Sequence, residues 1–203
     1  MTNFEFVFSL LVILLGLALA AVLGGVARVM QVRPPVRIGW ATGLLASWVT
    51  TETIIFWQLF WHTRESLPGS SPVLFGGFII TALYYFAAAS VFPGNLDGRT
   101  ELDGYFMQEK GKVIGAVLLA LPLTVAVWGA VLGRRGFAVF DWFDWVTFGI
   151  MYVAGPIALL TRRRNVAIVC LGLLVVVDLL DPVAVLILPG ADVGHPVSVG
   201  TGH

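Results

Sequence analysis

Charge and cysteine are both scarce in this sequence. Asp, Glu, Lys and Arg make up 12% of the 203 residues, about half their share in a soluble domain. The 12 basic residues balance the 12 acidic ones, so net charge does not indicate a partner. Cys170 is the one cysteine, whereas a disulfide framework or a CxxC-type metal site needs cysteines in pairs. We therefore expect Cys170 to be an ordinary core residue.

The familiar signatures of catalysis are also missing. The sequence contains no HExxH zinc motif, no GxSxG nucleophile elbow and no phosphate-binding GxxxxGKS/T loop. Of the three histidines only His62 borders an apolar stretch, so none is placed inside a membrane span to ligate haem. The sequence therefore predicts no catalytic, cofactor-binding or metal-binding residues and no cofactor.

Apolar residues dominate the composition. Hydrophobic side chains account for 58% of the sequence, and the mean hydropathy is +0.92. A soluble fold of this size cannot bury so much apolar surface, which argues against a soluble enzyme, a disordered chain and a nucleic-acid-binding protein. Runs of about 20 apolar residues indicate membrane-spanning helices, because barrel strands would alternate in polarity. Six stretches qualify: Phe6–Ala27, Ile38–Trp61, Val73–Phe92, Val113–Leu132, Phe140–Leu160 and Val166–Leu188.

Basic residues predict the orientation of these six spans, because the loops richest in Lys and Arg lie in the cytoplasm. The first, third and fifth loops hold nine: Arg28, Arg33, Arg37, Arg99, Lys110, Lys112, Arg162, Arg163 and Arg164. The other side holds three: Arg64, Arg134 and Arg135. The expected fold class is therefore all-α, a polytopic membrane protein of six transmembrane helices with both termini outside (N-out/C-out). We expect it in a bacterial cytoplasmic (inner) membrane.

The predicted spans form one bundle over residues 1–188, and a tail over 189–203 is expected to be mobile. We interpret the longest loop, 93–112, as a cytoplasmic elbow between two spans. It is expected to contain a short helix, capped by Thr100, whose apolar side, including Leu102 and Phe106, lies on the membrane surface. A docking surface for a partner is the alternative interpretation.

Small residues recur four apart in the first span, in the sets Gly16/Ala20/Gly24 and Ala21/Gly25. This spacing lets helices approach one another closely. It favours packing within one bundle, with homodimerisation as the alternative. The expected partners are therefore the lipid bilayer and, in the second case, another copy of the chain or a larger membrane complex. No nucleic acid is expected.

Three acidic residues lie inside predicted spans, where a charge costs at least about 2.5–3.5 kcal/mol. Glu52 is in the second span, and Asp178 and Asp181 share a helix face in the sixth. In the predicted topology all three lie at a similar depth in the outer half. Pro182 has no N–H, which frees the carbonyl of Asp178. Because these groups are hard oxygen ligands, we predict a candidate site for a proton, Na⁺ or a divalent cation.

A structural interpretation competes with this one. No Lys, Arg or His lies at that depth to pair with the acids. Protonated carboxyl groups can instead bond across helices to hydroxyl groups, and the candidates are Thr50, Thr51, Thr81, Tyr84 and Tyr85. The sequence alone favours structural hydrogen bonding over a proton or cation pathway.

Asp141 and Asp144 are a second pair of acids three residues apart, at the start of the fifth span. Acids at a helix N-terminus cap it and complement its dipole. We therefore interpret both residues as capping groups rather than as a glycosidase-like carboxyl pair.

Several short motifs carry a resemblance to a known family: Phe4-Glu5-Phe6, Gly16-Leu17-Ala18-Leu19-Ala20, Val36-Arg37-Ile38-Gly39-Trp40, Leu83-Tyr84-Tyr85-Phe86-Ala87-Ala88 with Phe92-Pro93, and Leu102-Asp103-Gly104-Tyr105-Phe106. Through them, roughly the first 115 residues resemble a family of small polytopic bacterial inner-membrane proteins whose members are mostly uncharacterised. The resemblance implies a membrane location and a helical bundle but no activity. In that family an acid often stands where Ala21 stands here, so the resemblance assigns no role to this position.

The sequence favours a non-enzymatic integral membrane protein, an accessory or structural subunit. The first alternative is a small proton- or cation-linked transporter or channel that uses Glu52, Asp178 and Asp181. The second is a membrane-embedded enzyme that acts on lipid or quinone. A transporter requires the three acids to converge on one wet cavity, whereas an enzyme requires a polar cluster that opens at the membrane surface.

Overall fold

The computed structural model describes residues 3–187 except 34, 65, 68–69, 97–99, 138–139 and 141, and it leaves the side chains of 3–7, 135 and 181–187 undescribed. The predicted tail over 189–203 and Asp141 therefore lie outside the described residues. Within the described part the fold is all-helical, with one isolated bridge between Arg37 and Glu101. The helices are α1 (Asn3–Gln31), α2 (Trp40–His62), α3 (Ser71–Val91), α4 (Asp103–Leu132), α5 (Arg134–Phe137), α6 (Trp142–Leu160) and α7 (Arg164–Ile187).

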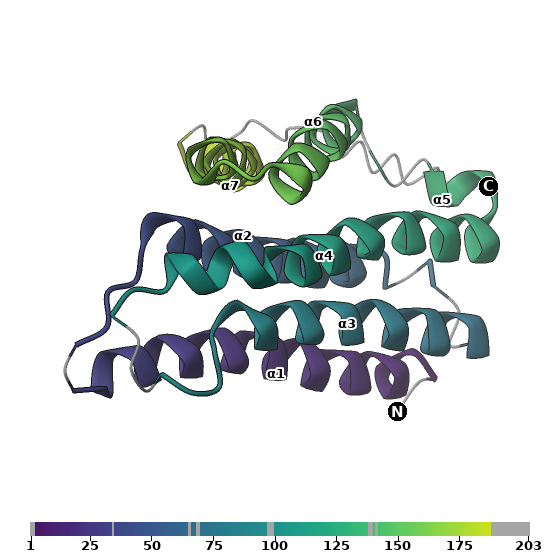
Figure 1. Ribbon diagram of the computed structural model, residues 1–203. Coiled ribbons are helices and arrows are strands. Elements are labelled where there is room, and N and C mark those ends of the chain that lie inside the picture. Colours follow the sequence, from purple (N-terminus) through teal and green to yellow (C-terminus); the bar gives the residue numbers. More distant parts are fainter. Residues whose placement is uncertain are drawn as a thin grey trace, which may run out of the picture.

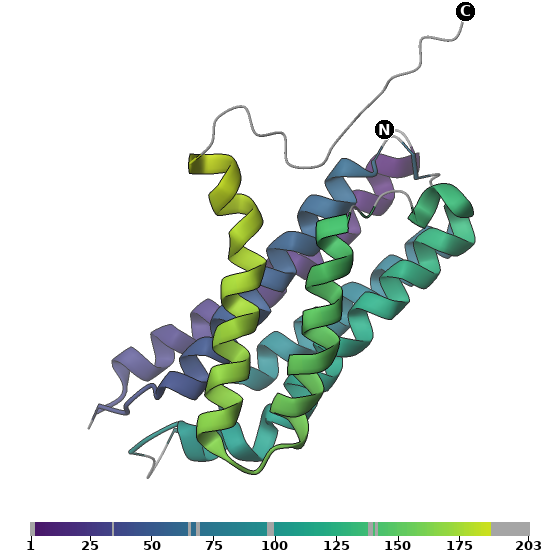
Figure 2. The same ribbon diagram turned by 90° about the horizontal axis from the view of Figure 1, so that it is seen from above.

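The helices stack in three layers (Figure 1). α1 and α3 lie side by side in the first layer, α2 and α4 form the second, and α6 and α7 cover the second at an angle (Figures 1 and 2). α3 makes its largest contacts with α4 and α1, while α7 packs against α6 and α2. The last of the described helices is thereby brought beside the second.

Each of the six predicted spans overlaps one of the six long helices of the described chain. Four of these helices are long and apolar enough to cross a membrane: α1 from Phe8 onward, α3, α4 and α6. α2 is less apolar because it carries four threonines, Gln58 and Glu52, and in α7 the described side chains end at Leu180. The four apolar helices mark the chain as a membrane-embedded, multi-pass protein.

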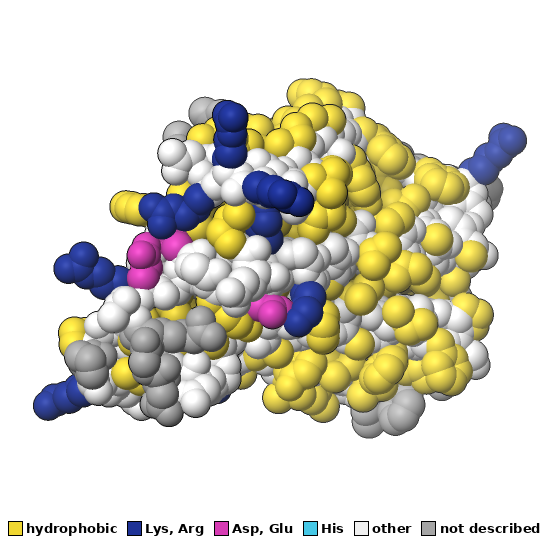
Figure 3. Space-filling model, in the orientation of Figure 1, with side chains coloured by type: hydrophobic (Ala, Val, Ile, Leu, Met, Phe, Trp, Pro, Cys, Tyr) yellow, Lys and Arg dark blue, Asp and Glu magenta, His cyan; other side chains and the backbone are white. Residues whose placement is uncertain are grey.

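Basic side chains gather at one end of the bundle. The α1–α2, α3–α4 and α6–α7 connections meet there (Figure 2), and Figure 3 shows most of the visible Lys and Arg side chains at that end, beside a largely hydrophobic surface. We call it the basic end. The opposite end, where α2 finishes and α6 begins, is called the far end.

The expectation of a separate short helix within 93–112 is wrong. α4 runs without a break from Asp103 to Leu132, and its N-cap position is Leu102 rather than Thr100. Leu102 and Phe106 are 0% and 1% exposed, because they pack into the core instead of onto a membrane surface. The apolar face that suggested a surface helix is thus the buried face of the fourth long helix.

The first residue of α4 ties three helices together at the basic end. Asp103 is 4% exposed and accepts hydrogen bonds from the backbone N–H and the hydroxyl of Thr42, both at 3.3 Å. It therefore caps the start of α2 from a different helix. Arg164, the first residue of α7, lies 3.5 Å from Asp103 and 3.3 Å from Glu101. These contacts hold the starts of α2, α4 and α7 together.

The small residues of α1 separate into two faces. A Cβ atom added at Gly25 would lie 2.3 Å from the ring of Phe92, so a glycine is needed where α1 meets the end of α3. Gly16, Ala20 and Gly24 are exposed, and a Cβ at either of the two glycines would meet nothing within 4 Å. Packing within the bundle therefore accounts for only one of the two small-residue sets.

Candidate functional site

Two of the three predicted site residues lie on a common cavity. Glu52, near the middle of α2, and Asp178, on α7, both line a cavity of about 90 Å³ between α2, α4, α6 and α7. Its other polar lining residues are Gln58, Asp144 and Thr147. Its apolar lining residues are Ile55, Leu121, Phe143, Phe148, Met151 and Val177. We call this space the acid cavity.

Asp178 has the smallest exposed fraction among the described acidic side chains of the site. It is 5% exposed, and its Oδ2 atom has no hydrogen-bond partner among the described residues. Neither Glu52 nor Asp178 forms an ion pair with a described basic side chain. A buried carboxyl oxygen without a partner is unfavourable, so the described residues leave Oδ2 unsatisfied, although the carboxyl group lies beside Glu52 and Trp48.

Glu52 has hydrogen-bonding neighbours on two other helices, Tyr84 on α3 and Asp178 on α7. The hydroxyl of Tyr84 on α3 lies 3.5 Å from Oε2 of Glu52 and donates to it. The indole of Trp48, one turn before Glu52 on α2, lies beside both carboxyl groups. Its N–H nevertheless makes no hydrogen bond within the described structure. The acid pair is thus surrounded by aromatic side chains rather than by cations.

Most of the hydroxyl groups expected to bond with the acids do not. Tyr84 is the one that reaches Glu52. Thr50 donates instead to the carbonyl of Ala46, and Thr81 to that of Gly77, each within its own helix. Tyr85 is 43% exposed. Threonine in a helix commonly donates to a carbonyl of the preceding turn. The hydroxyls of Thr50 and Thr81 are therefore already used within their own helices.

Two further acids lie toward the far end: Asp181, which the sequence predicted as part of the site, and Asp144, which it did not. Asp181 belongs to α7, but its side chain is outside the described residues. Asp144, in the first turn of α6, lines the acid cavity and was assigned only a capping role from the sequence. Its position on a helix that packs against both α4 and α7 was needed to place it beside the acid pair.

The size and lining of the acid cavity restrict what it can hold. A volume of about 90 Å³ corresponds to about three water molecules. Within the described residues, no group of three or more His, Cys, Asp or Glu side chains is arranged to hold a metal ion. The cavity therefore suits a proton with a few water molecules, or a single small cation, better than an organic solute.

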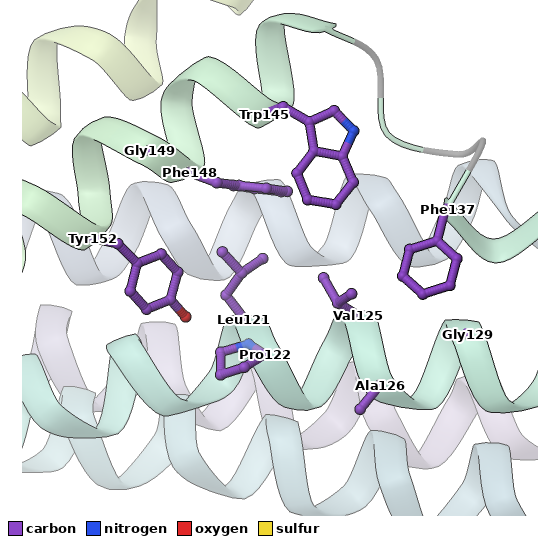
Figure 4. A pocket seen from close by; sticks show the side chains of 10 residues that line it. All are labelled: Leu121, Pro122, Val125, Ala126, Gly129, Phe137, Trp145, Phe148, Gly149 and Tyr152. Atoms are coloured by element: carbon purple, nitrogen blue, oxygen red, sulfur yellow. The ribbon is translucent and has the colours of Figure 1, made fainter.

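An apolar pocket adjoins the acid cavity, and Leu121 and Phe148 line both spaces. It has a volume of about 650 Å³ and lies between α4, α5 and α6, with the rings of Phe137, Trp145 and Phe148 facing α4 (Figure 4). All but a small part of its lining is apolar. Of these two spaces, the acid cavity is the one lined by acidic side chains.

The one buried basic side chain among the described residues, Lys110, lies at the basic end and not at the acid cavity. Lys110 on α4 is 5% exposed and donates to the carbonyl oxygens of Ala158, at 2.7 Å, and of Thr161. These carbonyls end α6 at the basic end, where a cation complements the helix dipole. Lys110 therefore stabilises a helix terminus and does not neutralise the acid pair.

Compared with family models, curated proteins and solved structures, the chain has no match.

Proposed function

We propose that this chain is a six-span membrane protein that carries protons or small cations through a carboxyl pair, Glu52 and Asp178. In this proposal the basic end faces the cytoplasm of a bacterial cell and both termini lie outside. The excess of basic residues at that end supports the orientation. The sequence alone favoured an accessory or structural subunit. The geometry of the acid cavity favours a transporter or channel over such a subunit.

The observation that carries the proposal is the meeting of two acids from helices far apart in the sequence. Glu52 and Asp178 are 126 positions apart by their numbering and line one cavity. Acids within spans are costly, and where they occur they commonly mark ion or proton pathways. A purely structural pair would be expected to have its oxygens satisfied, whereas Oδ2 of Asp178 has no partner in the described structure.

A liposome flux assay tests this function. The purified chain would be reconstituted with internal indicator dyes for H⁺, Na⁺ or K⁺, and the movement of each ion would be followed under its own imposed gradient. Glu52→Gln and Asp178→Asn are expected to remove most of the flux, because each replaces an ionisable group by a neutral one of similar shape.

Glu109→Gln is the matched control, since Glu109 pairs with exposed Lys112 on α4 and does not line the acid cavity. It is expected to leave flux unchanged. The absence of H⁺, Na⁺ and K⁺ flux in the parent protein would refute the proposal, and so would full flux in both cavity variants.

A further inference from the structure

We propose that Thr147, Gln58 and Asp144 form a one-sided access path along which a proton in water or a small hydrated cation reaches the acid pair from the far end. The inference rests on the proposed function for its biological meaning. The path itself is a physical claim about which side of the membrane communicates with the cavity, and it can be tested without transport.

Two helices carry the polar lining from the acid pair toward the far end. On α2, Glu52, Ile55 and Gln58 are spaced by three residues and all line the cavity. Six residues of helix cover about 9 Å along the axis, so Gln58 lies well beyond Glu52 in the direction of His62, where α2 ends. The cavity therefore extends toward the far end.

α6 supplies the opposite wall in the same direction. Asp144, in its first turn, and Thr147 and Met151, further along, recur at helical spacing and line the cavity. Because α6 begins at the far end, Asp144 is nearest to the surface and Met151 is deepest. An acid near the surface attracts cations toward a cavity lined by further acids.

The cavity is closed toward the basic end by apolar packing. Trp48 and Leu174 stand four residues before Glu52 and Asp178, and they are 0% and 1% exposed. Val49 and Leu171, also in these helices, are 0% exposed. None of these four residues lines the acid cavity. A packed apolar layer is a barrier to ions and water, so access from the basic end would require a conformational change.

Unsatisfied oxygen atoms inside the cavity point to an occupant. The Oδ2 atom of Asp178 and the hydroxyl of Thr147 are both buried, and neither has a hydrogen-bond partner in the described structure. Asp178 is 5% exposed and lines the cavity. Buried polar atoms of this kind are normally satisfied by water or an ion, which suits a path filled with water.

Cysteine accessibility tests the path. In a Cys170→Ser background, Thr147→Cys and Gln58→Cys would be treated with Ag⁺, a small cation that binds thiols and is compatible with a cavity of about 90 Å³, applied to one side of sealed vesicles at a time. Ser66→Cys and Arg163→Cys mark the two sides, because Ser66 follows α2 at the far end and Arg163 lies in the α6–α7 connection at the basic end. Both marker positions are exposed.

The expected result is loss of the free thiol in Thr147→Cys and Gln58→Cys from the Ser66 side, with no loss from the Arg163 side. Val146→Cys is the matched control. Val146 adjoins Thr147 on α6 but is 49% exposed on the outer surface of the bundle and does not line the cavity. In lipid its thiol is expected to remain unmodified from both sides.

Modification of the cavity cysteines from the Arg163 side would overturn the access path. So would their protection from both sides, or equal modification of Val146→Cys. These outcomes are separable from the flux assay. One-sided modification in a protein without flux would support the access path and refute the transport function. Acid-dependent flux with protected cysteines would support the transport function and refute the access path.

Discussion

The hydroxyl of Tyr152 on α6 donates a hydrogen bond to the main-chain carbonyl oxygen of Leu118 on α4, at 2.9 Å. Leu118 stands four residues before Pro122, which lies inside α4 and has no N–H to offer that carbonyl. The tyrosine side chain points at α4 near Pro122 (Figure 4). A neighbouring helix thus supplies the donor that the proline removes, which is how prolines are tolerated in membrane helices.

Tyr152→Phe removes this donor and leaves the carbonyl of Leu118 unsatisfied. We expect the variant to lose about 1 kcal/mol of unfolding free energy, measured by denaturant titration in mixed detergent micelles. Tyr85→Phe is the control, because Tyr85 is 43% exposed on α3, and it should leave stability unchanged. Equal effects of the two substitutions would contradict the assigned role of the Tyr152 hydroxyl.

Two adjacent glycines of α1 should respond in opposite directions to alanine. Gly25→Ala would place a Cβ 2.3 Å from the Phe92 ring, and overpacking of this kind costs about 1–3 kcal/mol. Gly24→Ala meets nothing within 4 Å, so the higher helix propensity of alanine should add up to about 1 kcal/mol. Thermal unfolding in detergent would compare the two, and a stable Gly25→Ala variant would show that α1 and α3 are not in close contact there.

Lys110→Met is expected to destabilise the junction between α4 and α6. The substitution keeps most of the buried side-chain length but removes the donor to the carbonyls of Ala158 and Thr161, a loss of about 1.5–3 kcal/mol for a charged hydrogen bond. Lys112→Met should change stability by less than about 1 kcal/mol, because Lys112 is 60% exposed in its ion pair with Glu109. Protease resistance at the α6–α7 connection reports on this junction, and similar sensitivity of both variants would argue against the Lys110 contact.

Asp178→Leu distinguishes a functional acid from a structural one. Because Oδ2 of Asp178 has no partner in the described structure, an apolar replacement should keep or raise the unfolding free energy, by about 1 kcal/mol, while flux is lost. Leu174→Ala, one turn earlier on α7 and 1% exposed, should lose about 2–5 kcal/mol. If Asp178→Leu instead destabilises the protein as strongly as Leu174→Ala, the carboxyl group is a structural hydrogen-bonding residue.

Hydropathy located the helices because spanning segments must satisfy their own backbone groups. Each predicted span overlaps a long helix, and α1, α3, α4 and α6 are apolar enough to cross a membrane. The same reasoning failed at Leu102 and Phe106, since an apolar face looks alike whether it meets lipid or a neighbouring helix. These two residues lie at the buried start of α4, which begins at Asp103 and not at Val113, where the predicted span began.

The sequence by itself determined the class of the protein and singled out Glu52 and Asp178, because an acid inside an apolar run is conspicuous without any coordinates. Only the tertiary structure decided that these two acids share a cavity and that Asp144 belongs with them. The physical reason is that spacing along one helix places residues on a face, whereas the packing of α7 against both α2 and α6 determines which faces meet. Depth in the membrane can be inferred along each span, but neighbours between spans depend on how the helices pack.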